Sequence, residues 1–278
     1  MCIGYSYIND RSQLLSTPGF DDQLADLDIA LFARIDAQLT ADDKRSLLAV
    51  QHALRERTPD YVYLEIGSHL GGSIQPHLQD ARCARIISID KRPTAVPDDR
   101  GYDVPYPENS TAHMLSLLRG LSADADARIT CFDTDATALA PERLPERPHL
   151  CFIDGEHTER AALADYAFCR KVVRDNGVIL FHDANVIYTG LVKIIAQLEA
   201  ENAAFRAYVL PSSIFVLAFG ESALHDDRAI AEMLLNNHRQ YLFGLMSLEH
   251  YREVYNRKPV RVMRTIWQTW LKYRRRLG

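Results

Sequence analysis

The stretch Tyr61-Val-Tyr-Leu-Glu-Ile-Gly-Ser-His-Leu-Gly-Gly-Ser73 tells most about this chain. An apolar run rich in β-branched and aromatic residues carries Glu65 near its end, and a glycine-rich turn follows at Gly67. What comes next looks like the start of a helix. A strand, a tight turn and a helix in this order let the backbone approach a nucleotide-like ligand closely.

The spacing of the turn says which kind of ligand fits. A dinucleotide-binding turn has the pattern Gly-x-Gly-x-x-Gly and uses its second glycine to admit a pyrophosphate. Here that position is His69, and the glycines at Gly67 and Gly71 are separated by three residues. Glu65 adds negative charge that would repel phosphates. The turn therefore favours a cationic or amino-bearing ligand, and a purely structural strand-to-helix turn is the alternative.

Downstream of residue 60, short apolar runs alternate with helical stretches. This alternation predicts an α/β fold, a Rossmann-like, doubly wound and mostly parallel sheet with helices on both faces. The last two strands are separated only by Pro211-Ser-Ser and should form an antiparallel edge hairpin. The seven expected strands are 61–66, 85–89, 128–132, 149–153, 177–181, 206–210 and 214–219, and the expected helices are 72–81, 108–121, 157–175 and 188–203.

The segments on either side of this core differ from it. Residues 1–20 are polar and turn-rich, which indicates a loosely held arm, and residues 21–57 show helical periodicity. Residues 222–256 indicate further helices. We therefore expect an arm and helical cap over residues 1–59, a core over 60–221 and a helical extension over 222–278.

Composition limits the classes of partner. The 278 residues carry a formal net charge of -5, yet about eight Lys and Arg and no acid lie beyond residue 256, so the remainder carries about -13. No broad basic face is left for nucleic acid. Five scattered cysteines without a Cys-x-x-Cys pair indicate buried thiols in a reducing compartment. We see no secretory signal and no membrane-spanning run, and expect a cytoplasmic protein.

The basic C-terminal segment differs from the rest of the chain in its charge and its apolar pattern. Its last 22 residues, 257–278, combine Lys and Arg with apolar positions at helical spacing and hold both tryptophans of the chain. Such a helix is typical of binding to the interface of an anionic membrane, so the protein could be peripheral at the inner face of the membrane. A helix docked on the acidic body or on a partner subunit is the alternative, and homo-oligomerisation is left open.

Two further strand ends carry acids, and one loop is unusual. Asp90 ends the strand after the glycine turn and can accept hydrogen bonds from both ribose hydroxyls of a nucleoside. Asp135 follows the next strand and is the candidate for an adenine contact. A helix cap or a surface acid is the alternative for Asp90. Residues 93–107 hold four prolines and three Asp residues, which indicates a loop that acts as a lid or substrate loop, or else an irregular insertion.

The most distinctive motifs lie at two later strand ends. Leu150-Cys-Phe-Ile-Asp154-Gly-Glu-His157 delivers Asp154 and then His157, and Gly177-Val-Ile-Leu-Phe-His182-Asp183 delivers a His and an Asp together. Neighbouring parallel strands bring such ends to one pocket. Two carboxylates with water suit Mg²⁺ or a similar ion, and a neutral imidazole beside them can take a proton from a hydroxyl. Turn or helix-cap roles are the alternative.

Taken together, Glu-x-Gly-x-x-x-Gly, the strand-end acid, Phe-Ile-Asp-Gly-x-His and Gly-Val-Ile-Leu-Phe-His-Asp resemble the class I S-adenosylmethionine-dependent methyltransferases. The similarity covers roughly residues 60–220 and is strongest to the macrolide sugar and catechol-type O-methyltransferases. It implies that Asp154 and Asp183 bind a divalent metal, that His157 is the general base and that Asp154 also lies at the cofactor. The implied cofactor-binding residues are Glu65, Gly67, Ser68, Gly71, Ser73, Asp90, Asp135 and Asp154.

The chain departs from these families at the metal site. The macrolide sugar enzymes have a second acid just before the last metal-binding Asp, and this chain has His182, which we include among the expected metal ligands with Asp154 and Asp183. The catechol type has Asn directly after that Asp, and here Asn185 comes one residue later, after Ala184.

These features predict an S-adenosylmethionine-dependent O-methyltransferase that acts on a hydroxyl of a small molecule or glycan, most plausibly a sugar or glycoconjugate. Metal coordination would lower the pKa of the acceptor hydroxyl and His157 would remove its proton. A nucleotide-dependent oxidoreductase of the NAD type on the same sheet is one alternative. A membrane-recruited module without enzymatic activity is the other.

Overall fold

The computed structural model describes residues 19–235, 237–238, 242, 244–246, 249–250, 253–254, 257, 259, 262–263 and 266. The arm expected over residues 1–20 lies outside the described residues, apart from its last two positions. Most of the basic segment 257–278 also lies outside them.

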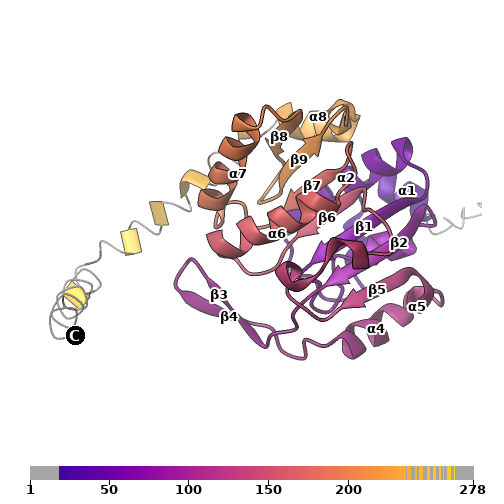
Figure 1. Ribbon diagram of the computed structural model, residues 1–278, viewed down its shortest axis with the longest axis horizontal. Coiled ribbons are helices and arrows are strands. Elements are labelled where there is room, and N and C mark those ends of the chain that lie inside the picture. The colour runs from indigo at the N-terminus through magenta and orange to yellow at the C-terminus, as the bar shows by residue number, and fades with distance from the viewer. Residues whose placement is uncertain are drawn as a thin grey trace, which may run out of the picture.

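A seven-stranded sheet forms the centre of the molecule (Figure 1), with the spatial order β5-β2-β1-β6-β7-β9-β8. The strands β5, β2, β1, β6 and β7 are parallel, and β9 runs antiparallel between β7 and β8. The predicted Rossmann-like sheet and its edge hairpin are therefore confirmed. The strands are β1 (Tyr61–Ile66), β2 (Cys83–Ile89), β5 (Ile129–Phe132), β6 (Leu150–Ile153), β7 (Val178–Phe181), β8 (Phe205–Val209) and β9 (Phe215–Phe219).

The position of β1 in the sheet explains why its sequence is an almost continuous apolar run. Every residue of β1 is buried, with Tyr61 and Tyr63 in the core on one face of the sheet and Val62 and Leu64 in the core on the other. A strand covered on both faces needs apolar side chains at successive positions. Each fully buried aliphatic side chain of this kind contributes roughly 1.5–3 kcal/mol to folding.

Helices cover both faces of the sheet. The core that contains Val62 is closed by α6 (Glu159–Val172) and α7 (Tyr188–Ala200), which pack against each other. The core that contains Tyr61 is closed by α1 (Phe20–Ala25), α2 (Ala41–Arg57), α3 (Gln75–Gln79), α4 (Thr111–Arg119), α5 (Ala125–Arg128) and α8 (Arg228–Leu235). Four 3-10 helices complete the described elements: η1 (Ile29–Phe32), η2 (Ala136–Ala138), η3 (Pro141–Arg143) and η4 (Leu224–Asp226).

Helix α2 begins with a capping box that also reaches the site described below. The Thr40 hydroxyl accepts a hydrogen bond from the Asp43 backbone N–H at 3.1 Å, and the Asp43 carboxylate accepts one from the Thr40 N–H at 3.1 Å. This arrangement satisfies two N–H groups that a helix start leaves without partners. The same Asp43 carboxylate accepts from Ser213 N–H at 3.0 Å, and so ties the cap to the loop before β9.

The segment 93–107 is not the irregular loop that its prolines predict. Most of it forms an antiparallel hairpin of β3 (Ala95–Asp98) and β4 (Tyr102–Pro105), which Figure 1 shows as a ribbon apart from the main sheet. Prolines are tolerated because both strands of a two-stranded ribbon are edge strands with one unpaired side. Helix α3 is also shorter than the predicted helix 72–81, since it starts only at Gln75.

The described part of the C-terminal extension exposes apolar side chains. Ile230 of α8 is buried in the core, whereas the described positions farther along include the exposed residues Leu242, Leu245, Met246, Val262, Met263 and Ile266. Within the part of the chain that the structure describes, no helix has the length and the apolar character needed to span a bilayer.

Candidate active site

Two adjoining cavities lie at the carboxyl edge of the parallel strands. The first runs past the ends of β1, β2 and β5 and is bounded by η2 and α6, and its walls include Asp90, Asp135 and Asp165. The second lies toward the N-terminal cap and the β3–β4 hairpin, and its walls include Ser73, Arg100, His157, His182 and Asp183. Both cavities are bordered by Gly67, His69, Tyr106 and Asp154. A molecule in one cavity can therefore meet a molecule in the other at Asp154.

The glycine turn lets two strand ends come together. Gly67 has φ +90°, a conformation that favours glycine, and a Cβ there would lie 2.2 Å from the backbone oxygen of Asp154. Gly71 also has a positive φ, of +83°, but its missing side chain faces Leu118 of α4 at 3.0 Å. Gly71 borders neither cavity among their described walls, so its role is the packing of the turn against α4.

The acid of the opening motif lies beneath the turn. Glu65 is fully buried, and its carboxyl accepts hydrogen bonds from Ser73 Oγ at 2.5 Å and from the Tyr63 hydroxyl at 2.8 Å. Burial raises the pKa of Glu65 to about 8, although both hydroxyls act to lower it. Ser68 is buried as well, and its Oγ has no hydrogen-bond partner among the described residues. The turn thus holds one unsatisfied hydroxyl beside the cavities.

Glu65 predicts that the ligand-free protein loses stability as the pH rises. The carboxyl titrates near 4.5 ordinarily and near 8 in the fold, so the folded protein keeps a proton that the unfolded chain releases between these values. This contribution is complete below about pH 4.5 and is lost as the pH rises through about 8. Urea unfolding at pH 6, 7 and 8.5 should give a steeper fall for the native protein than for Glu65→Gln. Equal slopes would contradict the assignment.

The next two strand ends place their acids on the wall of the first cavity. Asp90 accepts hydrogen bonds from the backbone N–H groups of His69 at 2.9 Å and Arg92 at 2.7 Å, and so ties the glycine turn to the end of β2. Asp135 caps η2, because its carboxylate accepts from the N–H of Thr137 at 2.9 Å and from its hydroxyl at 2.7 Å. Both acids therefore have a structural role, and both also lie on the wall of the first cavity, so their contacts with a nucleoside stay a prediction.

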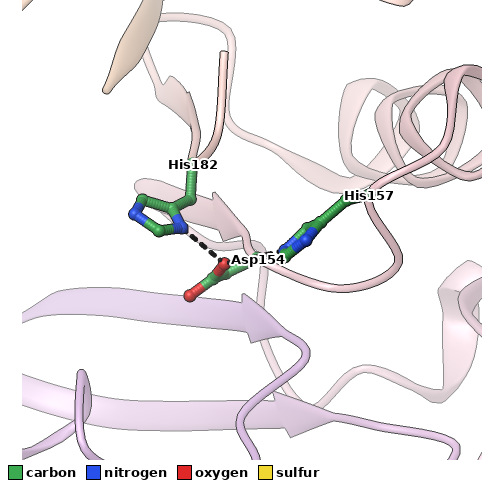
Figure 2. A group of neighbouring side chains, drawn as sticks. All are labelled: Asp154, His157 and His182. Carbon is green, nitrogen blue, oxygen red and sulfur yellow. Dashed lines mark hydrogen bonds and ion pairs between the residues drawn. The ribbon is translucent and has the colours of Figure 1, made fainter. Parts of the chain in front are cut away.

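His182 lies between two carboxylates. Its Nδ1 is 2.9 Å from Asp154 Oδ1, as Figure 2 shows, and its Nε2 is 3.5 Å from Asp43 Oδ2. Burial alone would lower the pKa of His182, but Asp154 and Asp43 override it and raise this pKa well above its ordinary value. The imidazole is therefore cationic here and links the N-terminal cap to the strand ends.

His157 approaches Asp154 from the opposite side (Figure 2) and is held by the hairpin. Its Nδ1 is 3.1 Å from Asp98 Oδ2 at the end of β3, and its backbone oxygen accepts from the Asp99 N–H at 3.0 Å. Its Nε2 is 3.1 Å from Asp183 Oδ2 and 3.9 Å from Asp154 Oδ1. This buried Nε2 forms no hydrogen bond of good geometry with the described residues, so it is the nitrogen that remains available to a ligand.

Comparison with known proteins identifies the domain that carries these cavities. The family profile described as "Methyltransferase domain" matches residues 64–184, from the glycine turn through the end of β7. Residues 64–184 form a methyltransferase domain. The similarity to methyltransferases that the motifs indicated is thereby confirmed.

One curated relative and several solved structures are similar to the methyltransferase domain. Uncharacterized protein R132 of Acanthamoeba polyphaga mimivirus is 25% identical over 147 residues, which are 51% of this chain and 62% of that protein. The chain thus spans less than two thirds of this relative.

Among solved structures, a putative O-methyltransferase from Klebsiella pneumoniae has 16% identity, covers 74% of this chain and 91% of its own, and has a TM-score of 0.46. An O-methyltransferase from Bacillus cereus in complex with SAH has 14% identity over 75% of this chain and 94% of its own, with a TM-score of 0.46. MycE methyltransferase from the mycinamycin biosynthetic pathway, in complex with Mg and SAH, has 14% identity over 72% of this chain and 55% of its own, with a TM-score of 0.49.

The methyltransferase domain offers donor atoms for a cation at the border between its cavities. One atom from each of Asp154, His157 and His182 lies within 4.8 Å of the others. Asp183, which was expected among the ligands, lies beside this group through its contact with His157. The convergence of two imidazoles on the Asp154 carboxylate, with the Asp183 carboxylate 3.1 Å from His157 Nε2, is the observation that fits a bound ion. Imidazole donors suit Fe²⁺ or Zn²⁺, whereas Mg²⁺ and Mn²⁺ prefer oxygen ligands.

Several residues of the site could not be found by reading motifs. Asp98 and Asp43 come from the hairpin and from the start of α2, and both contact a predicted histidine. Tyr106 follows β4 and borders both cavities. The acids near the prolines of 93–107 were a signal for Asp98, and the Thr40-Ala-Asp-Asp sequence was a signal only for a helix cap.

Proposed function

We propose that this methyltransferase domain transfers the methyl group of S-adenosylmethionine to a hydroxyl group of a sugar or glycoconjugate. The observation that carries the proposal is His157, whose buried Nε2 has no hydrogen bond of good geometry to the described residues, lies 3.1 Å from Asp183 Oδ2 and belongs to the wall of the second cavity. The first cavity would hold the cofactor and the second the acceptor. The two ligands would then react beside Asp154.

The chemistry that the cofactor supplies when bound is a methyl group on a positively charged sulfur. The acceptor oxygen forms the new bond to carbon as the carbon–sulfur bond breaks, and S-adenosylhomocysteine leaves. The protein has to hold the two ligands in line and remove one proton from the hydroxyl. Burial lowers the pKa of His157, but Asp154 and Asp183 raise it overall, so His157 takes this proton only from its neutral form. In that form Nδ1–H is engaged with Asp98 and Nε2 is the proton acceptor.

Asp98 holds the imidazole in the orientation that this step requires. Burial alone would raise the pKa of Asp98, but Arg100 lowers it, since its guanidinium donates to the carboxylate at 2.8 and 2.6 Å. The resulting carboxylate keeps the Nδ1 proton of His157 in place and leaves the Nε2 lone pair for the acceptor. A carboxylate behind a histidine fixes the tautomer in the same way in other proton-transfer sites.

The polar walls of the second cavity favour a sugar over a flat aromatic acceptor. A sugar brings several hydroxyls that each need a partner, and this cavity supplies charged and amide side chains from three separate elements. The ring of Tyr106 offers an apolar surface for the face of a sugar ring. The polar side chains on the wall include Asp36, Gln38, His69, Ser73, Arg100 and Asp183.

A divalent ion is part of the proposal. Asp154 and Asp183 would hold it, with His182 once this residue has lost its proton, and the ion would polarise the acceptor hydroxyl. Dialysis against EDTA should lower the rate of methyl transfer, and Mn²⁺ or Mg²⁺ should restore it. An unchanged rate after EDTA would remove the ion from the proposal and leave the transfer by His157 in place.

The whole proposal is tested by ligand binding and by product mass. Isothermal titration should show micromolar binding of S-adenosylhomocysteine and no binding of NADH. Incubation with S-adenosylmethionine and a panel of nucleotide sugars and glycosides, with catechols as comparison, should add one methyl group to a sugar acceptor. Binding of NADH without S-adenosylhomocysteine would instead favour an oxidoreductase. Binding of neither would favour a non-enzymatic module.

We also propose that the basic extension recruits the protein to an anionic membrane surface. Met263 and Ile266 are 70% and 63% exposed, and the surrounding sequence from residue 257 has about eight Lys and Arg and no acid. Each basic side chain near an anionic leaflet contributes about 1 kcal/mol to binding.

Pelleting with vesicles tests the extension directly. The full chain should sediment with phosphatidylserine vesicles, remain in solution with phosphatidylcholine vesicles, and lose binding at high salt. A chain that ends at residue 256 should remain in solution with both. Equal sedimentation of the full and shortened chains would show that these residues do not bind the membrane.

A further inference from the structure

One buried acid in the first cavity has no partner in the fold. Asp165 lies on α6, is 8% exposed, and forms no hydrogen bond or ion pair with the residues that the structure describes. Ala161 and Ala164 lie beside it on the same wall and leave space in front of the carboxyl. Buried carboxyl groups normally have partners, so an acid without one calls for a ligand.

The charged groups around Asp165 do not offset the cost of burying its carboxylate. Burial raises the pKa of Asp165 to about 7, Asp135 and Glu156 raise it further, and Lys91 acts in the opposite direction. Lys91 is itself paired with Glu156, since its Nζ is 3.0 Å from Glu156 Oε2. Near neutral pH a large share of Asp165 is thus a neutral carboxylic acid. A carboxylic acid has one O–H donor and one carbonyl acceptor side by side.

The position of Asp165 in the cavity indicates which part of a ligand it meets. Asp165 borders the first cavity and is absent from the described walls of the second. The reacting methyl group has to lie at the border between the cavities, near Asp154. Asp165 lies on α6, which packs against η2 at the far part of the first cavity. An adenosine that extends from the border past Asp90 therefore brings its base to Asp165.

We infer that Asp165 recognises the adenine of the cofactor by a two-point hydrogen bond. Its carbonyl oxygen accepts from the 6-amino group, and its O–H donates to a neighbouring ring nitrogen. This inference rests on the proposed function and adds to it a residue that selects for adenine. Asp165 Oδ2 lies 3.4 Å from the place a Cβ would take on Gly155, so the carboxyl reaches toward the loop that follows β6.

Two substitutions at Asp165 distinguish hydrogen bonding to the adenine from a side chain that only fills the wall of the cavity. Asn has a carbonyl acceptor and an N–H donor in the same places as the neutral acid, whereas Ala has neither. Isothermal titration at pH 6.5 should show that Asp165→Ala binds S-adenosylhomocysteine about tenfold more weakly than the native protein. Asp165→Asn should stay within about threefold. Asp175→Ala, which removes a surface acid of 90% side-chain exposure, is the matched control and should bind normally.

A second ligand shows where on the cofactor Asp165 acts. 5′-Methylthioadenosine keeps the adenosine and lacks the amino-acid end. Asp165→Ala should weaken it by the same factor as S-adenosylhomocysteine. Between pH 6.5 and 8.5 the native protein should lose about tenfold in affinity for 5′-methylthioadenosine as the acid ionises, and Asp165→Asn should lose none. Thermal melting establishes that each variant is folded.

The outcomes separate the inference from the proposed function. If the native protein binds S-adenosylhomocysteine and Asp165→Ala binds it equally well, the adenine contact is wrong and the proposed function stands. If Asp165→Asn is as weak as Asp165→Ala, the neutral two-point pair is wrong. Failure of the native protein to bind either ligand would overturn the proposed function itself, and the adenine contact with it.

Discussion

His157→Ala is expected to lower kcat of methyl transfer by about 10²–10⁴-fold, which is the range that a positioned general base supplies. The expectation follows from the surroundings of the two imidazole nitrogens. Nδ1 is fixed by Asp98 at 3.1 Å, and the buried Nε2 lies at the second cavity, 3.1 Å from Asp183 Oδ2 and without a hydrogen bond of good geometry to the described residues. Of the two cavities, His157 borders the second and not the proposed cofactor cavity, so S-adenosylhomocysteine should still bind within about threefold of the native affinity.

Single-turnover kinetics with saturating cofactor is the measurement, beside titration with S-adenosylhomocysteine. His113→Ala is the matched control, because His113 lies on α4, outside the described walls of both cavities, and its imidazole contacts only Glu108 among the residues that the structure describes. The control should retain the native rate. Retention of the native rate by His157→Ala on the true acceptor would show that another group removes the proton.

Asp98→Asn tests whether Asp98 of the β3–β4 hairpin contributes to methyl transfer by positioning His157. The amide cannot hold the Nδ1 proton as a carboxylate does, so kcat should fall by about 10-fold or more while KM for the acceptor changes little. Asp98→Glu should recover part of the loss, because it restores a carboxylate. A rise in KM with unchanged kcat would indicate that Asp98 binds the acceptor instead of positioning His157.

The sequence predicts the residues of this site that lie at the ends of strands. Asp90, Asp154 and Asp183 each follow an apolar run, and parallel pairing of β2, β1, β6 and β7 brings the ends of these runs to one edge. The rule that brings them together depends only on strand direction. The order of motifs along the chain is therefore enough to predict which acids meet.

Residues that reach the site from other elements could not be predicted in this way. Asp98 is 59 positions from His157 in the chain, and it meets the imidazole only because the segment forms a hairpin instead of a loop. Asp43 looks like an ordinary helix cap, and its second contact with His182 depends on how α2 packs over the sheet. Such contacts come from tertiary packing, which local patterns do not encode.

The charge of His182 is the most consequential of these packing effects. The motif places an imidazole among metal-binding acids, where it is expected to be a neutral ligand. Burial lowers the pKa of His182, but Asp154 on one nitrogen and Asp43 on the other raise it well above its ordinary value, which favours the protonated form. Binding of a metal through His182 therefore has to displace a proton, which makes metal affinity fall at low pH.

Gly67→Ala is expected to have the largest effect on folding of any substitution in the turn. A Cβ at this position would lie 2.2 Å from the Asp154 backbone oxygen and 2.6 Å from its carbonyl carbon. Backbone cannot move aside as a flexible side chain does, so the ends of β1 and β6 would have to separate. A left-handed φ adds about 1–2 kcal/mol for a residue with a side chain, and the clash should bring the total loss of unfolding free energy to about 4 kcal/mol.

Gly101→Ala isolates the contribution of the clash. Gly101 has φ +91°, nearly the same as the +90° of Gly67, but a Cβ there would have nothing within 4 Å. This variant should lose only the conformational cost of about 1–2 kcal/mol. Urea unfolding of both variants gives the difference, which measures how closely the two strand ends need to approach. If Gly67→Ala is no less stable than Gly101→Ala, the close approach of the turn to Asp154 is not what requires glycine. If Gly67→Ala is less stable than Gly101→Ala and also binds S-adenosylhomocysteine more weakly, the close contact between the turn and Asp154 both shapes the cavities and stabilises the fold.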